Sequence, residues 1–388
     1  MPDIKDHDAP RRVLLVTRNL PPVIGGMERL IGRVAETLAA HYETIVVGPQ
    51  GARLATQPLA YFGCPLSPPA QFLLAATRHA RAAAKHYRPQ LVFAGSGLTA
   101  PIARLAARKA GARYVVYLHG LDIAARNPVY RRFFLPAIRR ADLVLANSRY
   151  TAALAVEAGV PDARLRTLHP GVELPASVSD HVQSAKSFRE RYGLPTAGPI
   201  LFAAGRLTPR KGLADFVERV LPAIIAQVPA AQLVIAGEVP RHAAKRVGDE
   251  ANAIRTAAAA AGIAQRVHLI GPLDDDGLAL AWSAADVHVF PVRNDPHDPE
   301  GFGMVALEAA AHGVPTVAFA AGGIPDAVAD GMSGYLVHSG DYIRFAERVH
   351  RILAQQPLEI TKDECRAYAR GFAWDAFAAK LHRELTNL

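Results

Sequence analysis

The stretch that decides the fold is Ile200-Leu-Phe-Ala-Ala204, followed by Gly205-Arg206-Leu207-Thr208-Pro209-Arg210-Lys211-Gly212. Five apolar residues without alternation indicate a strand that is buried on both faces, as in a parallel sheet. The glycine and the basic residues that come next indicate a loop at the carboxyl end of this strand, ahead of a helix from about Leu213. Open parallel sheets bind their ligands at that end. The stretch therefore predicts a strand, a ligand-binding loop and a helix.

Similar apolar runs recur along the chain, separated by alanine-rich stretches that favour helices. Such an alternation indicates parallel sheets covered on both faces. The series pauses over residues 175–198, where Ser, Asp, Pro and Gly are frequent, and then restarts. We therefore predict an α/β protein with two Rossmann-like, doubly wound parallel-sheet domains. The runs cover residues 13–17, 44–48, 91–94, 114–118 and 143–146, then 200–204, 233–236, 267–270, 287–290 and 316–319.

The pause also sets the predicted domain ranges. We expect one domain over residues 1–180 and a second over residues 181–365. A helical segment over residues 366–388 can dock on either domain, and we favour the N-terminal one. Two such domains would face each other across a central cleft, lined by the loops at the carboxyl ends of their strands.

Composition excludes several classes of protein. At 388 residues, half of them hydrophobic, the chain is long enough for two cores. Two cysteines, Cys64 and Cys365, exclude a disulfide scaffold and a cysteine-rich metal site, and they suit a reducing compartment. The start is polar, without a signal-peptide core, and no stretch approaches the roughly 18 apolar residues that span a bilayer. We expect a soluble, cytoplasmic protein.

Charge is distributed unevenly along the chain. Residues 1–180 carry 23 Lys and Arg against 12 Asp and Glu, a net charge of +11. Residues 181–388 carry 21 against 23, a net charge of −2. All of the positive excess lies in the first half, which indicates an anionic partner there: a phospholipid surface, a nucleic acid or a phosphorylated acceptor.

Two carboxylates stand eight positions apart in Pro299-Glu300-Gly301-Phe302-Gly303-Met304-Val305-Ala306-Leu307-Glu308. The Gly-Phe-Gly turn leads into an apolar, helix-forming run, and the free backbone N–H groups of a helix start can hold an anion. Glu308 needs a polar partner if that run is buried. Both carboxylates can then face one small polar ligand. The alternative is a solvated helix face beside a flexible acidic loop.

Other strand ends carry cations, glycines and a histidine. Arg206 and Lys211 suit a diphosphate, whose oxygens they would neutralise in place of a metal ion, although a basic loop can also be merely solvated. Gly25-Gly26 permits close approach of a phosphate or sugar at a helix start, without being a dinucleotide fingerprint. His119 follows the fourth apolar run, where it can bond a sugar hydroxyl or serve the fold alone.

Some motifs are interpreted as structural. Asp274-Asp275-Asp276 is similar to a metal motif of another transferase architecture, but its position after Gly271-Pro272 indicates a helix-capping loop. Gly95-Ser96-Gly97 is not a Gly-x-Ser-x-Gly nucleophile motif, and no His, Cys or Asp cluster has metal-ligand spacing. The sequence predicts neither a serine nucleophile nor a metal site.

Taken together and in this order, the motifs resemble glycosyltransferase family 4, a large family of retaining enzymes with the GT-B fold. The resemblance runs from Val13 to about Val337. Each segment is weak alone, but the set in register is specific. The matching segments are Gly25-Gly26-Met27-Glu28, His119-Gly120, Ala146-Asn147-Ser148, His169-Pro170-Gly171-Val172, Gly205-Arg206-Leu207 with Lys211-Gly212, Ile235-Ala236-Gly237, Glu300 to Glu308, Gly322-Gly323-Ile324-Pro325-Asp326, and Asp330-Gly331 with Gly334.

This resemblance implies that the first domain binds the acceptor and the second binds the nucleotide-sugar donor. Arg206 and Lys211 would bind the donor diphosphate, and Glu308 the nucleoside ribose. Glu300 would hold hydroxyls of the donor sugar, with backbone N–H groups near Phe302. His119 would contact the same sugar, so that Arg206, Lys211, Glu300 and His119 are the implied catalytic residues. The implied donor-binding residues are Gly25, Gly26, Gly205, Arg206, Lys211, Glu300, Gly301, Phe302, Gly303, Met304, Val305 and Glu308.

The implied reaction moves a hexose from a nucleotide diphosphate sugar to an acceptor hydroxyl with retained anomeric configuration, without a metal or other cofactor. Arg206 and Lys211 would stabilise the leaving diphosphate. No enzymatic nucleophile is evident, so we favour same-face attack, in which the leaving phosphate accepts the proton of the acceptor. Bacterial transferases that mannosylate lipids or build surface polysaccharide are nearest in character, which favours GDP-mannose over a UDP-hexose.

Two basic segments suggest where the acceptor binds. Basic helices with exposed apolar residues suit an anionic membrane surface, unless the apolar residues are core and the arginines only solubilise. We expect a glycolipid, phospholipid or polysaccharide acceptor and peripheral contact with the inner face of the cell membrane. Nucleic acid is not expected, because there is no recognised binding module. The basic residues are Arg78, Arg81 and Lys85 in a helix predicted over 71–88, and Arg131 and Arg132 in the segment 128–140.

The main alternative is a catalytically inactive nucleotide-sugar-binding protein with an assembly or regulatory role. The joint presence of Glu300, Glu308, Arg206 and Lys211 argues against it. An NAD-dependent oxidoreductase or epimerase would need a dinucleotide fingerprint after the first strand. A phosphorylase of similar fold would need a pyridoxal-phosphate lysine, for which the sequence offers no context.

Overall fold

Two compact units make up the chain. The computed structural model describes residues 11–23, 25–125, 127–175, 181–239, 249–354 and 359–388. Unit 1 comprises the chain up to Gly171 together with Trp374–Leu388, and unit 2 comprises Val172–Ala373. The contacts divide the chain between residues 171 and 172. The sequence suggested residues 180 and 181 instead, and residues 176–180 of the proposed linker lie outside the described residues.

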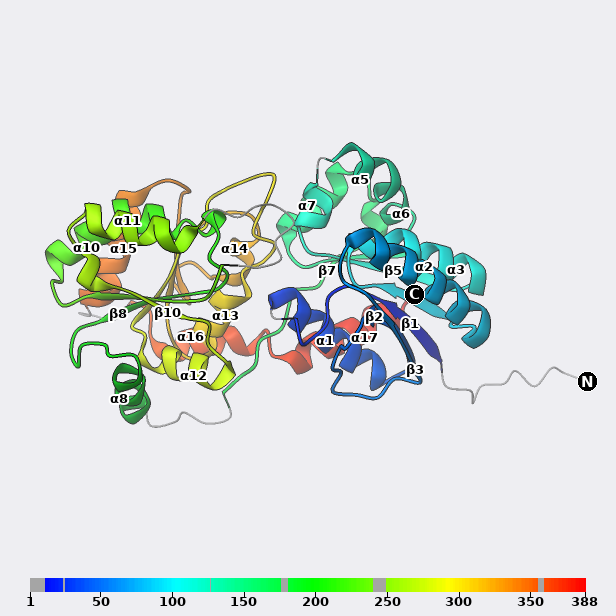
Figure 1. Ribbon diagram of the computed structural model, residues 1–388, viewed down its shortest axis with the longest axis horizontal. Coiled ribbons are helices and arrows are strands. Elements are labelled where there is room, and N and C mark those ends of the chain that lie inside the picture. Colours follow the sequence, from blue (N-terminus) through cyan, green and yellow to red (C-terminus); the bar gives the residue numbers. More distant parts are fainter. Residues whose placement is uncertain (1–10, 24, 126, 176–180, 240–248, 355–358) are drawn as a thin grey trace, which may run out of the picture. The chain divides into compact units, whose positions relative to one another are not determined.

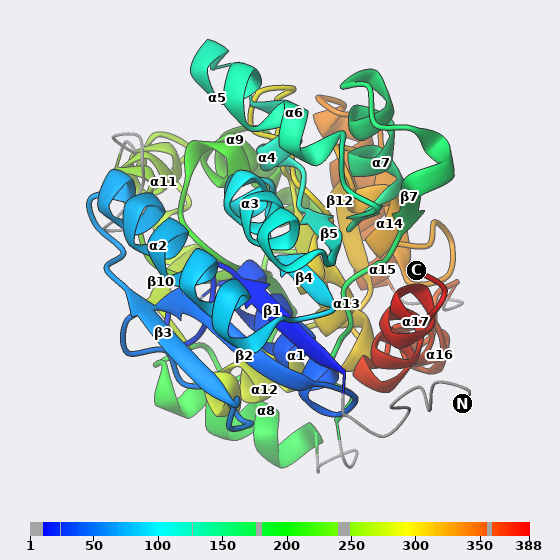
Figure 2. The same cartoon turned by 90° about the vertical axis from the view of Figure 1, so that its right-hand side faces the viewer.

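Unit 1 contains a parallel sheet with helices on both faces (Figures 1 and 2). Its strands lie in the order β3-β2-β1-β4-β5-β6-β7. In chain order the elements are β1 (Arg12–Val16), α1 (Gly26–Ala39), β2 (Glu43–Pro49), β3 (Ala60–Cys64), α2 (Pro69–Tyr87), β4 (Leu91–Ala94), η1 (Gly97–Thr99), α3 (Ala100–Ala110), β5 (Arg113–Leu118), α4 (Leu121–Ala124), α5 (Pro128–Phe133), α6 (Leu135–Ile138), β6 (Leu143–Ala146), α7 (Arg149–Glu157), η2 (Asp162–Arg164), β7 (Leu165–Thr167) and α17 (Trp374–Thr386).

Alternate residues of β1 explain the two hydrophobic cores of unit 1. Leu14 and Val16 are buried with residues of α2 and α3, whereas Val13 and Leu15 are buried with residues of α1 and α17. Successive side chains of a strand point to opposite faces, so a strand covered on both sides must be apolar throughout. The prediction made from the uninterrupted apolar runs is confirmed.

Unit 2 has a second parallel sheet, in the order β10-β9-β8-β11-β12-β13. Its central strand repeats the arrangement: Leu201 and Ala203 are in one core, and Ile200 and Phe202 are in the other. In chain order the elements are α8 (His181–Arg191), β8 (Ile200–Ala204), η3 (Pro209–Lys211), α9 (Leu213–Arg219), α10 (Leu221–Gln227), β9 (Gln232–Ala236), α11 (Glu250–Ala260), η4 (Ala264–Arg266), β10 (Val267–Gly271), α12 (Asp275–Ala284), β11 (Val287–Phe290), α13 (Met304–Ala311), β12 (Thr316–Phe319), α14 (Ile324–Ala327), β13 (Gly334–Val337), α15 (Tyr342–Ala354) and α16 (Lys362–Arg370).

The two ends of unit 2 differ from the sequence prediction. The polar stretch taken as a linker contains α8, which packs against α12 and buries Phe188 completely. The single C-terminal segment predicted over residues 366–388 is divided: α16 packs on α13 in unit 2, whereas α17 packs on α1 in unit 1. No helix in the described part of the chain is both long and apolar enough to cross a membrane.

The strand orders show where each sheet can bind a ligand. In unit 1 the chain first builds outward from β1 through β2 and then returns to β4 on the other side of β1. In unit 2 it builds outward from β8 through β9 and returns to β11. Open parallel sheets bind ligands outside the carboxyl ends of the strands at such a switch point. The loops after β1 and β4 in unit 1, and those after β8 and β11 in unit 2, are therefore the expected ligand-binding loops.

Candidate functional site

A charged cluster lies where the loops after β8 and β11 meet. Oε2 of Glu300 accepts a hydrogen bond from Nη1 of Arg210 at 2.7 Å and another from Nζ of Lys211 at 2.8 Å. The exposed fraction of these three side chains is between 13% and 15%. We call Arg210, Lys211 and Glu300 the ion cluster. It joins two strands that are neighbours in the sheet but about 90 residues apart along the chain.

Further contacts fix the two cations of the ion cluster. Nζ of Lys211 lies 4.8 Å from the centroid of the Phe290 ring, the last residue of β11. Nε of Arg210 lies 3.6 Å from Oδ1 of Asp298. A cation over an aromatic face is attracted by the ring quadrupole, and more strongly when both are removed from water. The cations are therefore held in place before any ligand arrives.

Electrostatics keep Glu300 ionised. Burial by itself would raise the pKa of the Glu300 carboxyl, but the charges and hydrogen bonds of Lys211 and Arg210 outweigh it and lower this pKa to about 2. Burial lowers the pKa of Lys211, while the attraction of Glu300 opposes that effect. At neutral pH the ion cluster thus contains a carboxylate that occupies the cations.

Backbone packing aligns the loops that carry the cluster. Gly212 has φ +69°, and a side chain there would collide with the carbonyl oxygen of Pro291. Gly322 has φ +55°, and a side chain there would collide with the carbonyl oxygen of Glu300, which accepts a hydrogen bond from the N–H of Gly323 at 2.8 Å. Only glycine combines these backbone angles with such close approach. The conformation of each loop is therefore fixed by its contact with the neighbouring backbone.

The rest of the predicted donor set in unit 2 surrounds this cluster. Arg206 is exposed in the loop directly after β8. Phe302 is buried, and Gly303, with φ 95°, precedes the first residue of α13. Glu308 is half-buried in the second turn of that helix. The structure thus brings Lys211 and Glu300 into direct contact, although the family resemblance implies that they bind different parts of the donor.

In unit 1 the predicted residues lie at the carboxyl ends of β1 and β5. Gly25 and Gly26 begin α1, and a side chain at Gly25 would collide with the Glu28 carboxylate, which also accepts a hydrogen bond from Nδ2 of Asn19 at 2.7 Å. His119 is 7% exposed, and its Nε2 lies 2.8 Å from the carbonyl oxygen of Gly95. Because a carbonyl oxygen only accepts, Nε2 carries a proton, and the tautomer with its single proton there would leave Nδ1 as an acceptor.

The two predicted basic segments differ. On α2 the side chains of Phe72 and four alanines are buried, whereas Leu74 is 70% exposed and Arg78, Arg81 and Lys85 are also exposed. Helix α5 buries none of its residues. Its exposed apolar side chains, Val129 at 63% and Phe133 at 64%, are neighbours of Arg131 and Arg132, which are also exposed.

Arg210 is the member of the ion cluster that sequence reasoning missed. The sequence predicts that Arg206 and Lys211 bind the diphosphate, and it predicts no role for Arg210, which stands next to Lys211. Its adjacency to Lys211 in a proline-initiated turn after a strand was the available signal. The interpretation of Asp274 as a cap is confirmed, because its Oδ1 accepts a hydrogen bond from the N–H of Gly277 at 2.8 Å.

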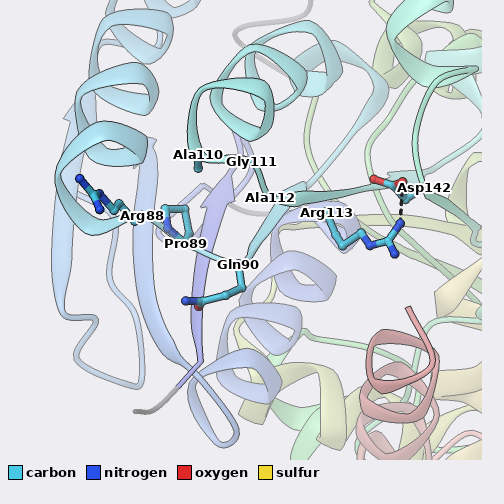
Figure 3. A pocket seen from close by; sticks show the side chains of 8 residues that line it. All are labelled: Arg88, Pro89, Gln90, Ala110, Gly111, Ala112, Arg113 and Asp142. Carbon is cyan, nitrogen blue, oxygen red and sulfur yellow. Dashed lines mark hydrogen bonds and ion pairs between the residues drawn. The ribbon is translucent and has the colours of Figure 1, made fainter. Parts of the chain in front are cut away.

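A hollow of unit 1 lies away from these residues. It has a volume of about 480 Å³ and is lined by the segments that precede β4, β5 and β6, with Arg113 and Asp142 paired at 3.4 Å (Figure 3). The amino ends of the strands form this rim, opposite the end where parallel sheets bind ligands. Within the described ranges, no group of three or more His, Cys, Asp or Glu side chains is arranged to hold a metal ion.

Comparison with protein families gives two matches that divide the chain at nearly the same place. Residues 24–175 match the model described as Glycosyltransferase Family 4. Residues 198–355 match the model described as Glycosyl transferases group 1. The first match covers the part with Gly25, Gly26 and His119, and the second covers the ion cluster.

Comparison with known proteins gives relatives over nearly the full length. The chain is 33% identical, over 93% of its length and 92% of the relative, to the GDP-mannose-dependent alpha-(1-6)-phosphatidylinositol monomannoside mannosyltransferase of Mycolicibacterium smegmatis. A D-inositol 3-phosphate glycosyltransferase of the same organism is 30% identical over 64% of this chain and 55% of its own. Among solved structures, HepE of Anabaena in complex with UDP and glucose has a TM-score of 0.76 at 19% identity, over 97% of this chain and 99% of its own. The fold is GT-B.

Proposed function

Because this chain belongs to glycosyltransferase family 4, a family of hexosyltransferases, we propose that it moves a hexose from a nucleotide diphosphate sugar to an acceptor hydroxyl with retained anomeric configuration and without a divalent metal. The preferred donor is GDP-mannose. This choice is supported by the relative that is named as GDP-mannose-dependent.

The ion cluster carries the proposal. The donor diphosphate brings negative charge to Arg206, Arg210 and Lys211, and it replaces Glu300 as the counter-ion of the cluster. Glu300 is then released towards hydroxyls of the donor sugar, next to the backbone N–H groups at the start of α13. Charge that develops on the leaving diphosphate meets cations that are already oriented, so little reorganisation is needed in the transition state.

Glu308 has a separate role in this scheme. It binds the nucleoside ribose, and His119 accepts a hydrogen bond from the donor sugar through Nδ1. The attacking acceptor hydroxyl gives its proton to the leaving phosphate on the same face of the sugar. Glu308→Ala should therefore mainly raise the KM for the donor, whereas Glu300→Ala should mainly lower kcat.

The acceptor is proposed to be lipid-linked or a phospholipid, reached from an anionic membrane surface. The observation in favour is α5, which places exposed apolar side chains beside exposed arginines. Such a surface binds anionic lipid through both burial and charge. Helix α2 supports such a role less, because it exposes one large apolar side chain, Leu74, while Phe72 and its alanines pack in the core of unit 1.

Turnover of a panel of nucleotide sugars, without and with phosphatidylinositol-containing vesicles as acceptor, tests the function. We expect one donor to be turned over and Arg206→Ala to reduce kcat/KM by about 100-fold, the effect of removing one charge-stabilising donor. Tight binding of a nucleotide sugar with no turnover under either condition would instead favour the inactive binding protein.

Co-sedimentation with vesicles tests the membrane surface. Wild type should bind vesicles with phosphatidylserine more than neutral ones, and Arg131→Ser with Arg132→Ser should reduce this binding. The matched control is Arg78→Ser with Arg81→Ser on α2, which removes the same charge from a helix that exposes one large apolar side chain, Leu74, instead of two. Equal binding to both vesicle types, unchanged by either double variant, would contradict the proposal.

A further inference from the structure

A column of aromatic rings leads from Lys211 of the ion cluster into the interior of unit 2. Nζ of Lys211 lies 4.8 Å from the centroid of the Phe290 ring. The Phe290 ring is stacked on the His288 ring, with 5.3 Å between their centroids. The Trp282 ring stands at 90° to the His288 ring, again with 5.3 Å between the centroids. We call Phe290, His288 and Trp282 the ring column.

His288 is buried at a place where an apolar side chain would cost less free energy. Its exposed fraction is 0%, and its neighbours in β11, Val287 and Val289, are apolar. Nδ1 of His288 lies 3.1 Å from Oγ1 of Thr316 on β12. Nε2 of His288 and Nε1 of Trp282 have no hydrogen-bond partner among the described residues. A buried polar atom without a partner costs free energy, so a histidine in the middle of the sheet needs an explanation.

The contacts of His288 confine the Phe290 ring. The hydrogen bond between Nδ1 and Thr316 favours one orientation of the His288 ring, and the Phe290 ring is stacked on it. Gly303, which precedes α13, also confines Phe290, because a side chain at Gly303 would come within 3.0 Å of Cε1 of that ring. The Phe290 ring is therefore packed against His288 and Gly303, and it also contacts Lys211.

His288 carries no charge at neutral pH. Burial, and after it the positive charge of Lys211, lowers the pKa of His288 to about 3. An imidazolium at this place would repel the ammonium group of Lys211. A neutral ring can support Phe290 without that repulsion, so the attraction between Lys211 and the Phe290 ring is kept.

We propose that His288 is a positioning residue, which holds the Phe290 ring against Lys211 and so keeps this ammonium group where a nucleoside diphosphate needs it. The inference rests on the proposed function, because it takes the donor diphosphate as the ligand of Lys211. His288 is fully buried and acts only through Phe290. When the diphosphate replaces Glu300 as the counter-ion, Lys211 gives up its hydrogen bond to Glu300 but keeps its contact with the Phe290 ring.

Calorimetric titration of the full-length chain with GDP, and with UDP as a second probe, tests the inference without requiring turnover. His288→Leu removes the stacked ring, and we expect it to raise the Kd of the diphosphate by about fivefold, the factor that corresponds to one aromatic pair. Lys211→Met should raise this Kd further, because it removes the cation. Adding His288→Leu to Lys211→Met should leave the Kd unchanged, since no cation is left to position.

A rescue variant separates the loss of the ring from the loss of stability. His288→Phe with Thr316→Val restores a ring beside Phe290 and removes the hydroxyl that would lose its partner. The Kd of this double variant should lie within about twofold of wild type, since the stacked pair is kept. If His288→Leu does not fold, Phe290→Leu breaks the same stacked pair and takes its place in the comparison.

The matched control is His268→Leu on β10. It removes a half-buried histidine of the same sheet, whose Nε2 lies 2.9 Å from Oε1 of Gln232. This variant should lower the melting temperature without changing the Kd of the diphosphate, because it leaves the ring column intact. Thermal unfolding of every variant establishes that it is folded.

Two results would overturn the inference. One is a wild-type Kd in His288→Leu, and the other is an increase of the Kd by the same factor with and without Lys211. Either result would mean that His288 and Trp282 serve the core alone, with bound water as the partner of their ring nitrogens.

Turnover of nucleotide sugars separates this inference from the proposed function. If the Kd values show the coupling between His288 and Lys211 but no donor is turned over, the inference stands and the proposed function fails. If a donor is turned over but the coupling is absent, the proposed function stands and the inference fails. Binding of neither diphosphate would overturn both.

Discussion

The carboxyl edges of the two sheets are built on opposite principles. In unit 2 the edge is ionic and self-paired, because Glu300 already neutralises Arg210 and Lys211. In unit 1 three adjacent positions of the edge are unpaired, because Ser96, His119 and Asn147 each leave a buried atom without a hydrogen bond within the described residues, whereas the Asp122 carboxylate of the same edge is paired with two backbone N–H groups.

This difference follows from the free energy of burying each kind of group. Cations at 13% and 14% exposure would be strongly destabilising without a counter-charge, so the protein supplies one that a diphosphate can replace. A buried polar atom that carries no charge costs much less free energy when it lacks a hydrogen-bond partner. The unit 2 edge is therefore balanced in charge within the protein, whereas the unit 1 edge keeps unpaired polar atoms at a smaller cost in free energy.

Removal of Lys211 should have the largest effect on this comparison. Lys211→Ala takes away a cation that stabilises the leaving diphosphate, so we expect kcat/KM for the nucleotide sugar to fall by about 100- to 1,000-fold, or about 3–4 kcal/mol. Lys186→Ala, on the exposed surface of α8, is the matched control. A loss below tenfold would mean that the diphosphate does not use the ionic edge.

Glu300→Gln should have the second-largest effect, a loss of stability that depends on pH. The pKa of Glu300 is about 2 in the folded chain against an ordinary value of 4.5, so between these values the unfolded chain binds more protons. Its contribution to stability is therefore present above pH 4.5 and is lost as pH falls towards 2. At pH 7 we expect the variant to lose about 2 kcal/mol of unfolding free energy.

Chemical unfolding from pH 7 down to pH 3.5 measures this contribution as the difference between wild type and Glu300→Gln. The difference should shrink below pH 4.5. Glu347→Gln, on the exposed surface of α15, should behave like wild type throughout. A difference that is constant over this range would contradict the assignment of the low pKa to Glu300.

A smaller loss of unfolding free energy is expected for Arg210→Gln. This variant removes one of the two charged donors to Glu300 but leaves Lys211 in place, so the unfolding free energy should fall by about 1.5 kcal/mol. Arg255→Gln, exposed on α11, controls for the change of side chain. If the two variants unfold at the same denaturant concentration, Arg210 contributes no stabilising bond to the cluster.

The smallest effect on stability is expected for Ser96→Ala, in unit 1. Ser96→Ala removes a hydroxyl that has no partner, so no hydrogen bond is lost, and the unfolding free energy should change by less than about 0.5 kcal/mol or rise slightly. Ser283→Ala removes a hydroxyl that donates to the carbonyl oxygen of Ala279 at 3.0 Å. A loss above about 1 kcal/mol for Ser96→Ala would show that its hydroxyl has a structural partner.

Most of the sheet framework could be predicted from the sequence. The ten apolar runs coincide with strands, since burial on both faces leaves an uninterrupted apolar signal. The strands that were missed are β3, β7 and β13. Two of them are edge strands of the first sheet and one is an edge strand of the second. β3 and β7 are partly exposed, so their composition is mixed and their pattern is weak, whereas β13 is mostly buried but has only four residues and begins with a glycine.

Only part of the candidate site could be predicted from the sequence. Lys211 and Glu300 were named, but their contact was not, because they are paired through neighbouring strands and not through spacing along the chain. Arg210 was missed because a second basic residue in a loop resembles solvation.

The sequence by itself determined the α/β class, the parallel strands and the residue types at their carboxyl ends, because these depend on local apolar runs and on the residues that follow them. Only the tertiary structure decided which loops meet. Strand order placed β8 beside β11 and β4, β5 and β6 beside one another, and only that order brings the loops of Lys211 and Glu300 together and sets Ser96, His119 and Asn147 on adjacent strands. Pairing of this kind is non-local, so no pattern along the chain carries it.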